Sequence, residues 1–284
     1  MKKVVLGFSG GLDTTYCVKY LTLEKGCEVH SVIVNTGGFD EAELKKIEEH
    51  AYKLGVKTHT TVDAVKGYYD RIIKYLVFGN SLKNNTYPLS VSAERLVQAL
   101  HIADHVKALN ADAVAHGSTG AGNDQVRFDM VFHIMIPNAE IITPIRDLKL
   151  SREAEIAYLK EKGVEMNFEK AAYSINKGLW GTSVGGRETL NSKGLLPESA
   201  WPTQVTKHES EEVKLHFEKG ELVAVNDNSF SHPSEAIQYL QTLAGPYGIG
   251  RDIHVGDTII GIKGRVGFEA AAPLIIIKAH HLLE

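Results

Sequence analysis

Apolar runs and segments of helical periodicity alternate along the first 165 residues. Residues 4–8 form a near-continuous apolar run, which is typical of a strand buried on both faces of a parallel sheet. Similar runs predict a strand at 29–34, another at 56–62, and central strands at 113–115 and 140–142, whereas helical spacing predicts helices at 13–24, 41–54 and 93–109. Alternation at such short intervals predicts right-handed βαβ crossovers and a doubly wound parallel sheet of the α/β class.

The pattern changes after Gly163. Residues 213–217 alternate between apolar and polar side chains, turn at Glu218-Lys219-Gly220 and return through residues 221–225, which predicts an antiparallel hairpin. A helix is predicted at 234–243, and strands at 257–263 and 274–278. We therefore expect an α/β domain over residues 1–165 and a smaller α+β domain over residues 166–284. The chain ends shortly after the last predicted strand without a capping element, as expected of a fragment of a longer protein.

Composition narrows the classes of function. With 284 residues, of which 43% are hydrophobic, the chain is long enough to bury a substantial core. Its 31 basic and 35 acidic residues give a net charge of -4, without the basic excess of a nucleic-acid-binding surface. Cys17 and Cys27 form neither a CxxC pair nor a disulfide framework, which indicates a reducing compartment. Because no signal sequence and no apolar stretch of roughly 18 residues is present, we expect a cytoplasmic protein without a membrane partner.

The segment between the first predicted strand and helix reads FSGGLDTT and is called the first loop here (residues 8–15). Its Gly-Gly pair lets backbone N–H groups turn toward an anion, and the N-terminus of the following helix adds partial positive charge. Three hydroxyl groups are further donors: Ser9, Thr14 and Thr15. The carboxylate of Asp13 is suited to Mg²⁺. The alternative is an ordinary strand–helix turn in which Asp or Thr caps the helix.

Two other phosphate-binding motifs are excluded. The chain has no GxxxxGK(S/T) sequence, so it lacks the lysine of a P-loop NTPase, and its first turn has no GxGxxG dinucleotide fingerprint. The first loop instead resembles the PP-loop of ATP pyrophosphatases, which cleave ATP between the α- and β-phosphates.

A second glycine-rich segment, AHGSTGAGNDQVRF, follows the predicted strand at 113–115 and is called the second loop (residues 115–128). Three glycines allow its backbone to approach a ligand at the carboxyl end of the sheet, where open α/β folds bind ligands. Asn123, Asp124 and Arg127 fall on the first turn of a helix, with Asn123 and Arg127 on one face. Amide, carboxylate and guanidinium groups so placed can hold a zwitterionic amino acid. The alternative is a glycine-rich turn whose Asn and Asp cap the helix.

At this point the resemblance becomes specific. The sequence HGSTGAGNDQVRF resembles the HGxTGxGNDQVRF signature of the argininosuccinate synthase family. Residues 86–92, TYPLSVS, resemble that family's RYPLGTS segment, and residues 173–183 resemble its YSxDxNLWxxS segment. Together with SGGLDT, four separated motifs occur in order, and the similarity extends from residue 4 to the C-terminus.

The resemblance implies a nucleotide-binding domain at 1–165 and a synthetase domain at 166–284, with ATP and Mg²⁺ as cofactors. The ATP-binding residues would be Gly7, Phe8, Ser9, Gly10, Gly11, Leu12, Asp13, Thr14, Thr15, Val34 and Gly117. The aspartate-binding residues would be Thr119, Asn123 and Asp124, and the citrulline-binding residues Tyr87, Ser92, Asn123, Arg127, Ser174 and Ser183. Asp13, Asp124 and Arg127 are the candidates for catalysis, and Asp13 is also the candidate Mg²⁺ contact, through pyrophosphate.

The implied reaction joins citrulline and aspartate in two steps within arginine biosynthesis. The citrulline ureido oxygen attacks the α-phosphorus of ATP to give a citrullyl-adenylate and pyrophosphate, and the aspartate amine then displaces AMP. We assign no general base, because a polarised ureido oxygen needs positioning and charge stabilisation above all. Asp124 is a candidate for the amine proton, although a grip on the α-ammonium suits it better.

Two departures from the family pattern stand out. The family carries a Glu and a Tyr that reach the citrulline α-amine, whereas this chain has Gly256 and Phe268 at those positions. One hypothesis is that the pocket accepts N-acylated citrulline; the alternative is that Asp257 or another acid takes the place of the Glu. The family's long C-terminal helical extension, which reaches around neighbouring subunits, is also absent, so we expect a homo-oligomer that is a tetramer only in the full-length form.

Other residues and other functions provide alternatives to this assignment. His116 and Arg146 lie where they could contact phosphate, whereas His101 and His105 have a ligand-like spacing without a third ligand.

A tRNA-thiolating PP-loop enzyme would need catalytic cysteines and a basic surface, and an amidotransferase type would need a further domain or partner. A non-enzymatic nucleotide-binding module would not need the cluster at Asn123, Asp124 and Arg127.

Overall fold

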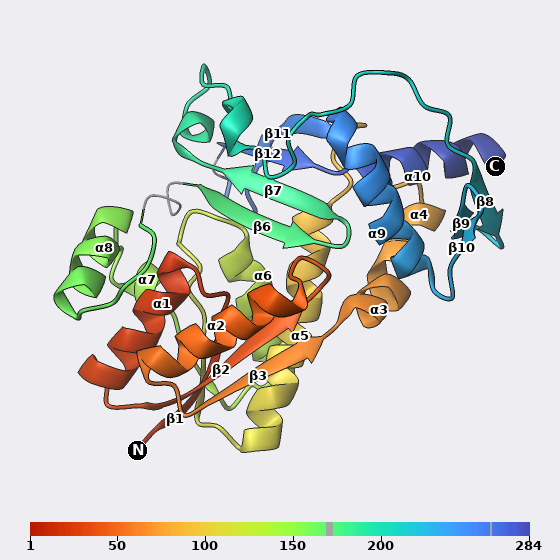
Figure 1. The fold of residues 1–284 in the computed structure, drawn as a ribbon. Coiled ribbons are helices and arrows are strands. Elements are labelled where there is room, and N and C mark those ends of the chain that lie inside the picture. Colours follow the sequence, from red (N-terminus) through yellow and green to blue (C-terminus); the bar gives the residue numbers. More distant parts are fainter. Residues whose placement is uncertain (169–172, 262) are drawn as a thin grey trace.

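The structure, a computed structural model, describes residues 1–168, 173–261 and 263–284 (Figure 1). Its first half contains a five-stranded parallel sheet with the strand order β3-β2-β1-β4-β5. The strands are β1 (Lys3–Gly7), β2 (Glu28–Asn35), β3 (Thr58–Asp63), β4 (Ala113–Ala115) and β5 (Glu140–Ile142). The predicted α/β class with a parallel sheet is confirmed.

Helices cover both faces of this sheet because its strands alternate their buried side chains between two cores. Val4 and Leu6 of β1 pack with Cys17 of α1 in one core, and Val5 packs with Val114 in the other, which includes α5. The longer helices are α1 (Leu12–Lys19), α2 (Glu41–Leu54), α5 (Ser90–Leu109), α6 (Asp124–Met135) and α8 (Arg152–Glu161). Shorter elements are α3 (Val65–Tyr68), α4 (Lys74–Phe78), α7 (Pro144–Asp147) and π-helical turns at Tyr20–Glu24 and Tyr69–Ile73.

The second half is built around two antiparallel sheets. One has the order β11-β12-β7-β6 and the other β10-β9-β8. Their strands are β6 (Ser174–Gly178), β7 (Gly181–Gly185), β8 (Leu215–Glu218), β9 (Glu221–Val225), β10 (Asn228–Ser229), β11 (Arg251–Asp257) and β12 (Lys263–Glu269). The helices are α9 (Pro233–Ala244), α10 (Ala271–Leu283) and 3-10 turns at Arg187–Leu190, Glu198–Ala200 and Gly245–Tyr247. The predicted hairpin at residues 213–225 is confirmed as β8–β9.

Two strand predictions were wrong, and a third strand was predicted correctly at residues 140–142 but in the wrong place in the sheet. The strand predicted at 257–263 is the end of a β11–β12 hairpin whose turn has Gly261 at a φ of +83°, and its apolar tip residues are exposed. The strand predicted at 274–278 belongs to α10, because a short apolar run does not distinguish a strand from a buried helical turn. The third, β5, was expected in the centre of the sheet but is its edge strand, where Glu140 is exposed.

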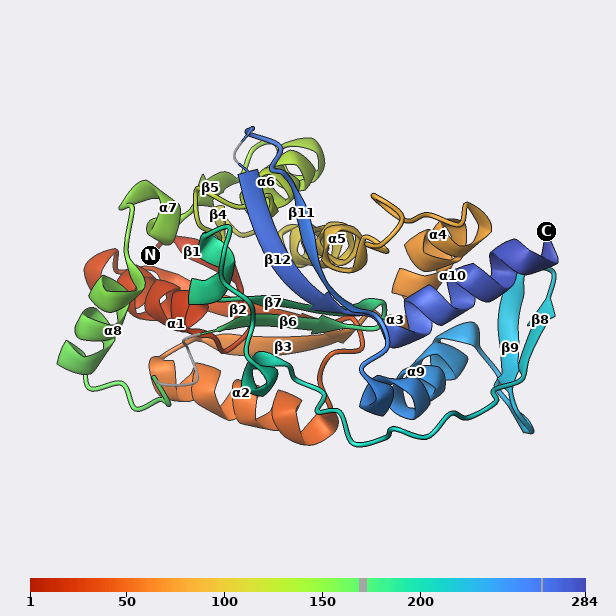
Figure 2. The same ribbon diagram turned by 90° about the horizontal axis from the view of Figure 1, so that it is seen from above.

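The two halves pack closely against each other. Leu179, in the β6–β7 turn, donates its N–H to the carbonyl of Thr36 at 2.8 Å, and the Trp180 indole donates to the carbonyl of Pro88 at 3.0 Å. Figure 2 shows the β11–β12 hairpin extending toward α6. The division at residue 165 stays a prediction. Within the described ranges, no helix combines the length and apolar character needed to cross a membrane.

Candidate active site

Strand order brings the two glycine loops together. The chain runs outward in one direction through β1, β2 and β3 and in the other through β4 and β5, so the order reverses between β1 and β4. The first loop follows β1 and the second follows β4, which places both at the switch point where open α/β sheets bind ligands. A Cβ at Gly117 would lie only 3.1 Å from the Cβ of Asp13, so the loops are in direct contact.

The first loop presents its backbone to solvent. Gly10 has a φ of +74°, a conformation suited to glycine, and Ser9 and Gly11 are exposed. No side chain caps the N-terminus of α1, so the N–H groups of its first turn lack an intrahelical partner. Hydrogen bonds between side chain and backbone within the loop are 3.3–3.4 Å long, near the limit for such bonds. These donors therefore remain available to an anion.

Part of the predicted ATP contact set is buried. Thr15 is completely buried, its hydroxyl lies 3.1 Å from His50 Nε2, and its N–H donates to the carbonyl of Gly11 at 2.9 Å. The predicted phosphate contact of the Thr15 hydroxyl is therefore not supported. Phe8, Leu12 and Val34 are also buried. Only small parts of those three residues can face a nucleotide.

Asp13 lies against a second carboxyl group that the sequence did not suggest. Glu155 of α8 is 1% exposed and hydrogen-bonds to Asp13. Burial raises the pKa of Glu155 to about 8, and the neighbouring charge of Asp13 acts in the same direction. Glu155 therefore carries a proton at neutral pH, and its neutral carboxyl group supports the Asp13 carboxylate in the first loop.

The second loop is fixed by side chains of its own half. His116 Nε2 lies 2.9 Å from Asp129 Oδ1, and its Nδ1 accepts the N–H of Ser118 at 3.3 Å. Arg146 donates to Asp129 at 2.6 Å and to Gln125 Oε1 at 3.2 Å. The phosphate contacts predicted for His116 and Arg146 are not supported, because these groups are engaged in holding the loop.

A continuous hydrogen-bond network joins the second loop to both halves of the molecule. It is called the Arg95 network and consists of Ser92, Arg95, Asp124, Arg127, Asn176 and Ser183. Arg95 is its centre: Nε donates to Asp124 at 3.0 Å and Nη2 to Asn176 Oδ1 at 2.6 Å. Arg127 donates to Asp124 at 3.0 Å and to the Ser92 hydroxyl at 3.0 Å. Four predicted site residues are thereby brought together.

The network depends on two β-strands of the second half and on two helices of the first. Asn176 of β6 and Ser183 of β7 are register partners, and the Asn176 amide donates to the Ser183 hydroxyl at 3.4 Å. Ser174 lies two residues along the same face of β6 and is exposed. Ser92 and Arg95 come from α5. The sequence predicted no role for Arg95 or Asn176, because charged and amide residues in amphipathic elements usually face water.

Asp124 is less suited to proton transfer than the sequence suggested. Burial alone would raise its pKa, but the guanidinium groups of Arg95 and Arg127 outweigh burial and hold the pKa below its ordinary value. Each carboxylate oxygen already accepts a hydrogen bond from a guanidinium group. Asp124 is therefore a poor base in this arrangement and serves to orient two arginines.

Beneath the network lies a buried acid. Glu94 is 2% exposed, and its Oε1 accepts hydrogen bonds from Arg95 at 3.2 Å and from Gln98 at 2.7 Å. Burial raises the pKa of Glu94 to about 7, and the charge of Arg95 opposes this rise only in part. A Cβ on Gly178 would approach Glu94 Oε2 to 2.3 Å, so β6 passes directly over this carboxyl group.

Tyr87 and the β11–β12 hairpin enclose the other side of the site. The Tyr87 ring stacks on His254 at a centroid distance of 4.8 Å and meets the edge of the buried Phe268 ring at 5.1 Å. At the hairpin tip, the N–H of Ile259 donates to Asn123 Oδ1 at 2.6 Å. The predicted ligand Asn123 therefore has its amide oxygen occupied, whereas the predicted ligand Thr119 is exposed in the second loop.

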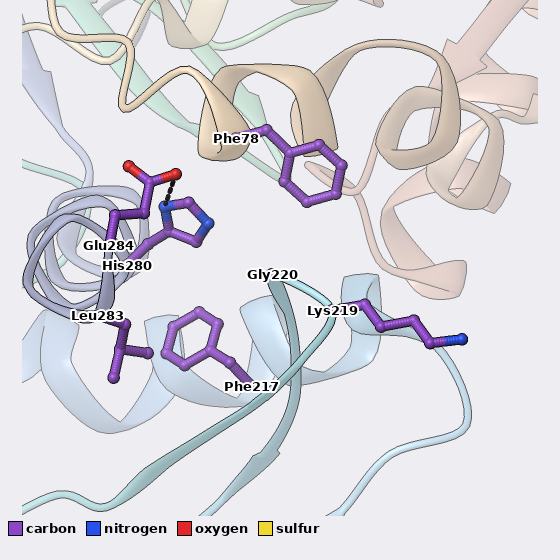
Figure 3. A pocket seen from close by; sticks show the side chains of 7 residues that line it. All are labelled: Phe78, Phe217, Lys219, Gly220, His280, Leu283 and Glu284. Atoms are coloured by element: carbon purple, nitrogen blue, oxygen red, sulfur yellow. Dashed lines mark ion pairs between the residues drawn. The ribbon is translucent and has the colours of Figure 1, made fainter.

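A cavity of about 480 Å³ lies elsewhere, between α4, the β8–β9 turn and the end of α10 (Figure 3). Its lining is Phe78, Phe217, Lys219, Gly220, His280, Leu283 and Glu284. None of the predicted site residues lines it, and two of its polar groups, His280 and Glu284, form an ion pair of 3.9 Å (Figure 3). It plays no part in the site between the loops.

Comparison with known proteins identifies the family of the chain. Residues 3–165 match the family model of the argininosuccinate synthase N-terminal HUP domain. Residues 173–284 match the family model of the argininosuccinate synthase C-terminal domain. The chain belongs to the argininosuccinate synthase family. It is a ligase, and the family uses ATP.

Individual relatives match over nearly the whole chain. Argininosuccinate synthase of Methanocaldococcus jannaschii is 41% identical over 99% of this chain and 71% of the relative. Argininosuccinate synthase of Xylella fastidiosa is 39% identical over 100% of this chain and 71% of the relative. Among solved structures, an NH3-dependent NAD synthetase from Campylobacter jejuni is 17% identical over 59% of this chain and 67% of that chain, with a TM-score of 0.40, a likeness too low to carry an argument.

The two substituted positions, Gly256 and Phe268, lie near Tyr87. Phe268 is fully buried in a cluster with Tyr87 and Ala270, so it acts as a packing residue on which Tyr87 rests. Gly256 lies on β11, two residues beyond the His254 ring that stacks on Tyr87. The side chain of Asp257, the alternative acid, lies outside the described part of the structure.

Proposed function

We propose that the chain joins citrulline and aspartate at the expense of ATP, through a citrullyl-adenylate. In the first step the ureido oxygen forms a bond to the α-phosphorus of ATP. The bond from that phosphorus to the bridging oxygen breaks, and pyrophosphate leaves with the electron pair. In the second step the aspartate nitrogen bonds to the ureido carbon, the carbon–oxygen bond breaks, AMP leaves, and the nitrogen loses one proton to solvent.

The contact between the two loops is the main support for this proposal. The first loop offers uncapped backbone donors to the triphosphate, which suits the charge of a departing pyrophosphate. The second loop meets Asp13 at Gly117, so an amino acid held by the second loop would lie beside the phosphates. Positioning of two reactants in this way replaces the need for a strong base.

The Arg95 network supports the assignment of the amino-acid substrates. It fixes Arg127 and Ser92 as a rigid pair, and Ser183 faces the same region from β7. Guanidinium, hydroxyl and amide groups of this kind recognise carboxylates and ureido groups by directed hydrogen bonds. We accordingly propose Arg127, Ser92 and Ser183 as citrulline contacts, with Tyr87 and Ser174 at its edges.

The residues present fit a Mg²⁺ ion that arrives with the nucleotide. Asp13 supplies one carboxylate beside the phosphate-binding backbone, and its neighbour Glu155 is buried and protonated. Within the described residues, no group of three or more His, Cys, Asp or Glu side chains could hold a metal by itself. Asp13 would hold the ion together with phosphate oxygens, and the ion would neutralise charge on pyrophosphate.

An isotope experiment tests the proposal. Citrulline labelled with ¹⁸O in the ureido group should transfer its label to the phosphate of AMP, because the ureido oxygen stays on phosphorus when AMP leaves. Steady-state formation of AMP and pyrophosphate should require citrulline and aspartate together, whereas citrulline alone supports at most one equivalent of pyrophosphate per site. Formation of ADP, AMP release without both amino acids, or unlabelled AMP would contradict the proposal.

We further propose, from the residues that stand at 256 and 268 near Tyr87, that the citrulline accepted here is acylated on its α-amine. Gly256 and Phe268 supply neither a carboxylate nor a hydroxyl for an ammonium group, and Phe268 is buried under Tyr87. An ammonium group without a partner is costly to desolvate, whereas an amide costs far less. Comparison of kcat/KM for citrulline and its N-acyl forms tests this choice, and a clear preference for free citrulline would refute it.

A further inference from the structure

Three side chains of the Arg95 network form a hydrogen-bond chain whose direction is fixed. A guanidinium group has only donors, so the Asn176 atom that faces Arg95 Nη2 at 2.6 Å is the amide oxygen. The other end of that amide is its NH₂ group, which donates to the Ser183 hydroxyl oxygen at 3.4 Å, long for such a bond. Arg95 therefore determines the orientation of the Asn176 amide and turns its donor end toward Ser183.

This direction leaves the hydroxyl hydrogen of Ser183 without an acceptor. An amide nitrogen accepts no hydrogen bond, so the hydrogen has to point away from Asn176. Ser183 is only 5% exposed, and no residue in the described part of the chain accepts a hydrogen bond from its O–H. Because a buried donor without a partner is costly, we expect a bound ligand to supply the acceptor.

Strand register places Ser183 between Asn176 and Phe268. Ser183 of β7 is directly opposite Asn176 of β6 and also directly opposite Phe268 of β12. Directly opposed side chains lie on the same face of a sheet, with Cβ atoms about 4.5–5.5 Å apart. The proposed function puts the acylated α-nitrogen of citrulline near Phe268, whose side chain has no polar group. The hydroxyl of Ser183 is the next side chain in this row, so it is suited to a polar group carried by that nitrogen.

The charge of the network also disfavours an ammonium group in this row. Arg95 and Arg127 carry two positive charges, and Asp124 carries one negative charge because its pKa is held below the ordinary value. Glu94, with a pKa of about 7, is protonated in part at neutral pH. The network therefore keeps a net positive charge, which repels an ammonium ion but accommodates an uncharged amide.

We infer that Asn176 is a positioning residue that sets the specificity for the amino-acid acceptor. By donating to Ser183, it makes the Ser183 hydroxyl a donor to the carbonyl oxygen of the acyl group on the citrulline α-nitrogen. This inference rests on the proposed ligation and on the proposed acylation. An ammonium group in place of the amide could use only the remaining lone pair of Ser183, and the buried O–H would stay without an acceptor. The competing assignment is that Ser183 donates to the ureido oxygen or the carboxylate, which every citrulline carries.

Asn176→Asp tests the direction of the chain. The aspartate keeps the shape of the side chain but accepts hydrogen bonds from both Arg95 and Ser183, so the Ser183 hydrogen turns inward and its oxygen faces the ligand. We measure kcat/KM for AMP formation with citrulline and with N-acetylcitrulline at saturating ATP and aspartate, and the binding of each by calorimetry without ATP. The preference for N-acetylcitrulline, expressed as the ratio of the two kcat/KM values, should fall by about tenfold or more.

Two results with this variant would overturn the inference. An unchanged ratio would mean that Asn176 does not set the preference. Equal losses with both acceptors would assign Ser183 to a group that every citrulline carries. Because the new carboxylate retains Arg95 as its partner, we expect the variant to fold, and thermal unfolding checks this.

Removal of the hydroxyl separates the direction of the chain from the added charge. In a Ser183→Ala background, Asn176→Asp should change the ratio by less than about twofold, since no hydroxyl remains to be turned. A full change of the ratio without Ser183 would mean that the new charge acts on the ligand directly, and it would overturn the inference. Asn138→Asp, in an exposed turn, is the matched control for the added charge and should leave the ratio within about twofold.

The same measurements separate this inference from the proposals on which it rests. The ratio in the wild type tests acylation, and its change in Asn176→Asp tests the role of Asn176. If calorimetry shows the change of preference but AMP never forms, the role of Asn176 stands and the proposed ligation fails. If AMP forms but the ratio does not respond to Asn176→Asp, the ligation stands and the role of Asn176 fails.

Discussion

The two glycine loops meet at the same point of the sheet, yet they are built in opposite ways. In the first loop, bonds from side chains to backbone measure 3.3–3.4 Å, and the donors of α1 have no side-chain cap. In the second loop, the side chains of His116, Asp124 and Arg127 are held at 2.9–3.0 Å by partners from α5 and α6. The first loop is therefore open for an anion to complete, whereas the second is already satisfied and serves as a rigid template.

The largest effect is expected when Arg95, the central residue of the Arg95 network, is removed. Arg95→Ala leaves Asp124 and the buried Glu94 without their shared guanidinium partner. Removal of one member of a buried ionic group costs about 3–5 kcal/mol, and we expect a loss of that size in the free energy of unfolding measured with denaturant. Loss of AMP formation should accompany it at any temperature where the variant is folded.

Arg71→Ala is the matched control, because Arg71 is an exposed arginine of the first half. It should change the free energy of unfolding by no more than about 0.5 kcal/mol. If Arg95→Ala behaved like this control, the network would not hold the second loop.

A change at the contact between the loops should separate their roles. Gly117→Ala brings a methyl group to 3.1 Å from the Cβ of Asp13 and should displace the first loop. We expect the KM for ATP to rise about tenfold or more, equivalent to about 1.4 kcal/mol, with a much smaller change in the KM for aspartate. Steady-state kinetics with each substrate varied in turn provides the measurement.

Gly122→Ala in the same loop is the control, since a Cβ there has nothing within 4 Å. It should leave both KM values within about twofold, because no packed group has to move. An equal rise in the ATP KM for both variants would mean that loop flexibility, and not the contact with Asp13, sets nucleotide affinity.

The same contrast explains what the sequence could and could not predict. The first loop was predicted in position and geometry because its structure rests on local features: a buried strand, two glycines and a helix start. For the second loop, the sequence predicted Asp124 and Arg127 on one helix but not their partners. Arg95 and Asn176 lie 29 and 52 residues from Asp124 in the chain, and no periodicity reports such contacts.

Errors in the secondary structure have the same origin. The apolar run at 274–278 was assigned to a strand, although α10 buries Ile276 and Ile277 by packing that only the folded chain supplies. Thr15 looked like a phosphate donor from its place in the motif, but its hydroxyl faces His50. Glu94 and Glu155 were not predicted because a glutamate in a helix usually faces solvent, and burial is a tertiary property.

The pH dependence of the free energy of unfolding tests the buried Glu94 beneath the Arg95 network. Because the pKa of Glu94 rises from 4.5 to about 7 on folding, the folded state binds more protons than the unfolded state between these values. The Glu94 contribution to stability is thus fully present below about pH 4.5 and is lost as the pH rises through about 7. Between pH 4.5 and pH 7, the free energy of unfolding of the wild type, measured with denaturant, should fall by roughly 1–3 kcal/mol relative to that of Glu94→Gln. A constant difference would contradict the assignment.

The smallest expected effect concerns the first loop and the buried carboxyl group of Glu155 beside it. Glu155, with a pKa of about 8, is neutral at pH 7 and donates to Asp13, but above pH 8 two carboxylates face each other beneath the phosphate site. The KM for ATP of wild type should therefore rise about threefold to tenfold between pH 7 and pH 9. Glu155→Gln keeps a neutral donor at every pH and should flatten this rise, whereas Glu155→Ala should raise the KM at both values. If Glu155→Gln followed the wild-type profile, the titration would belong to ATP or to another group, because both proteins share every other ionisable residue. A flat profile in the amide variant alone would mean that even the open loop depends on one buried proton.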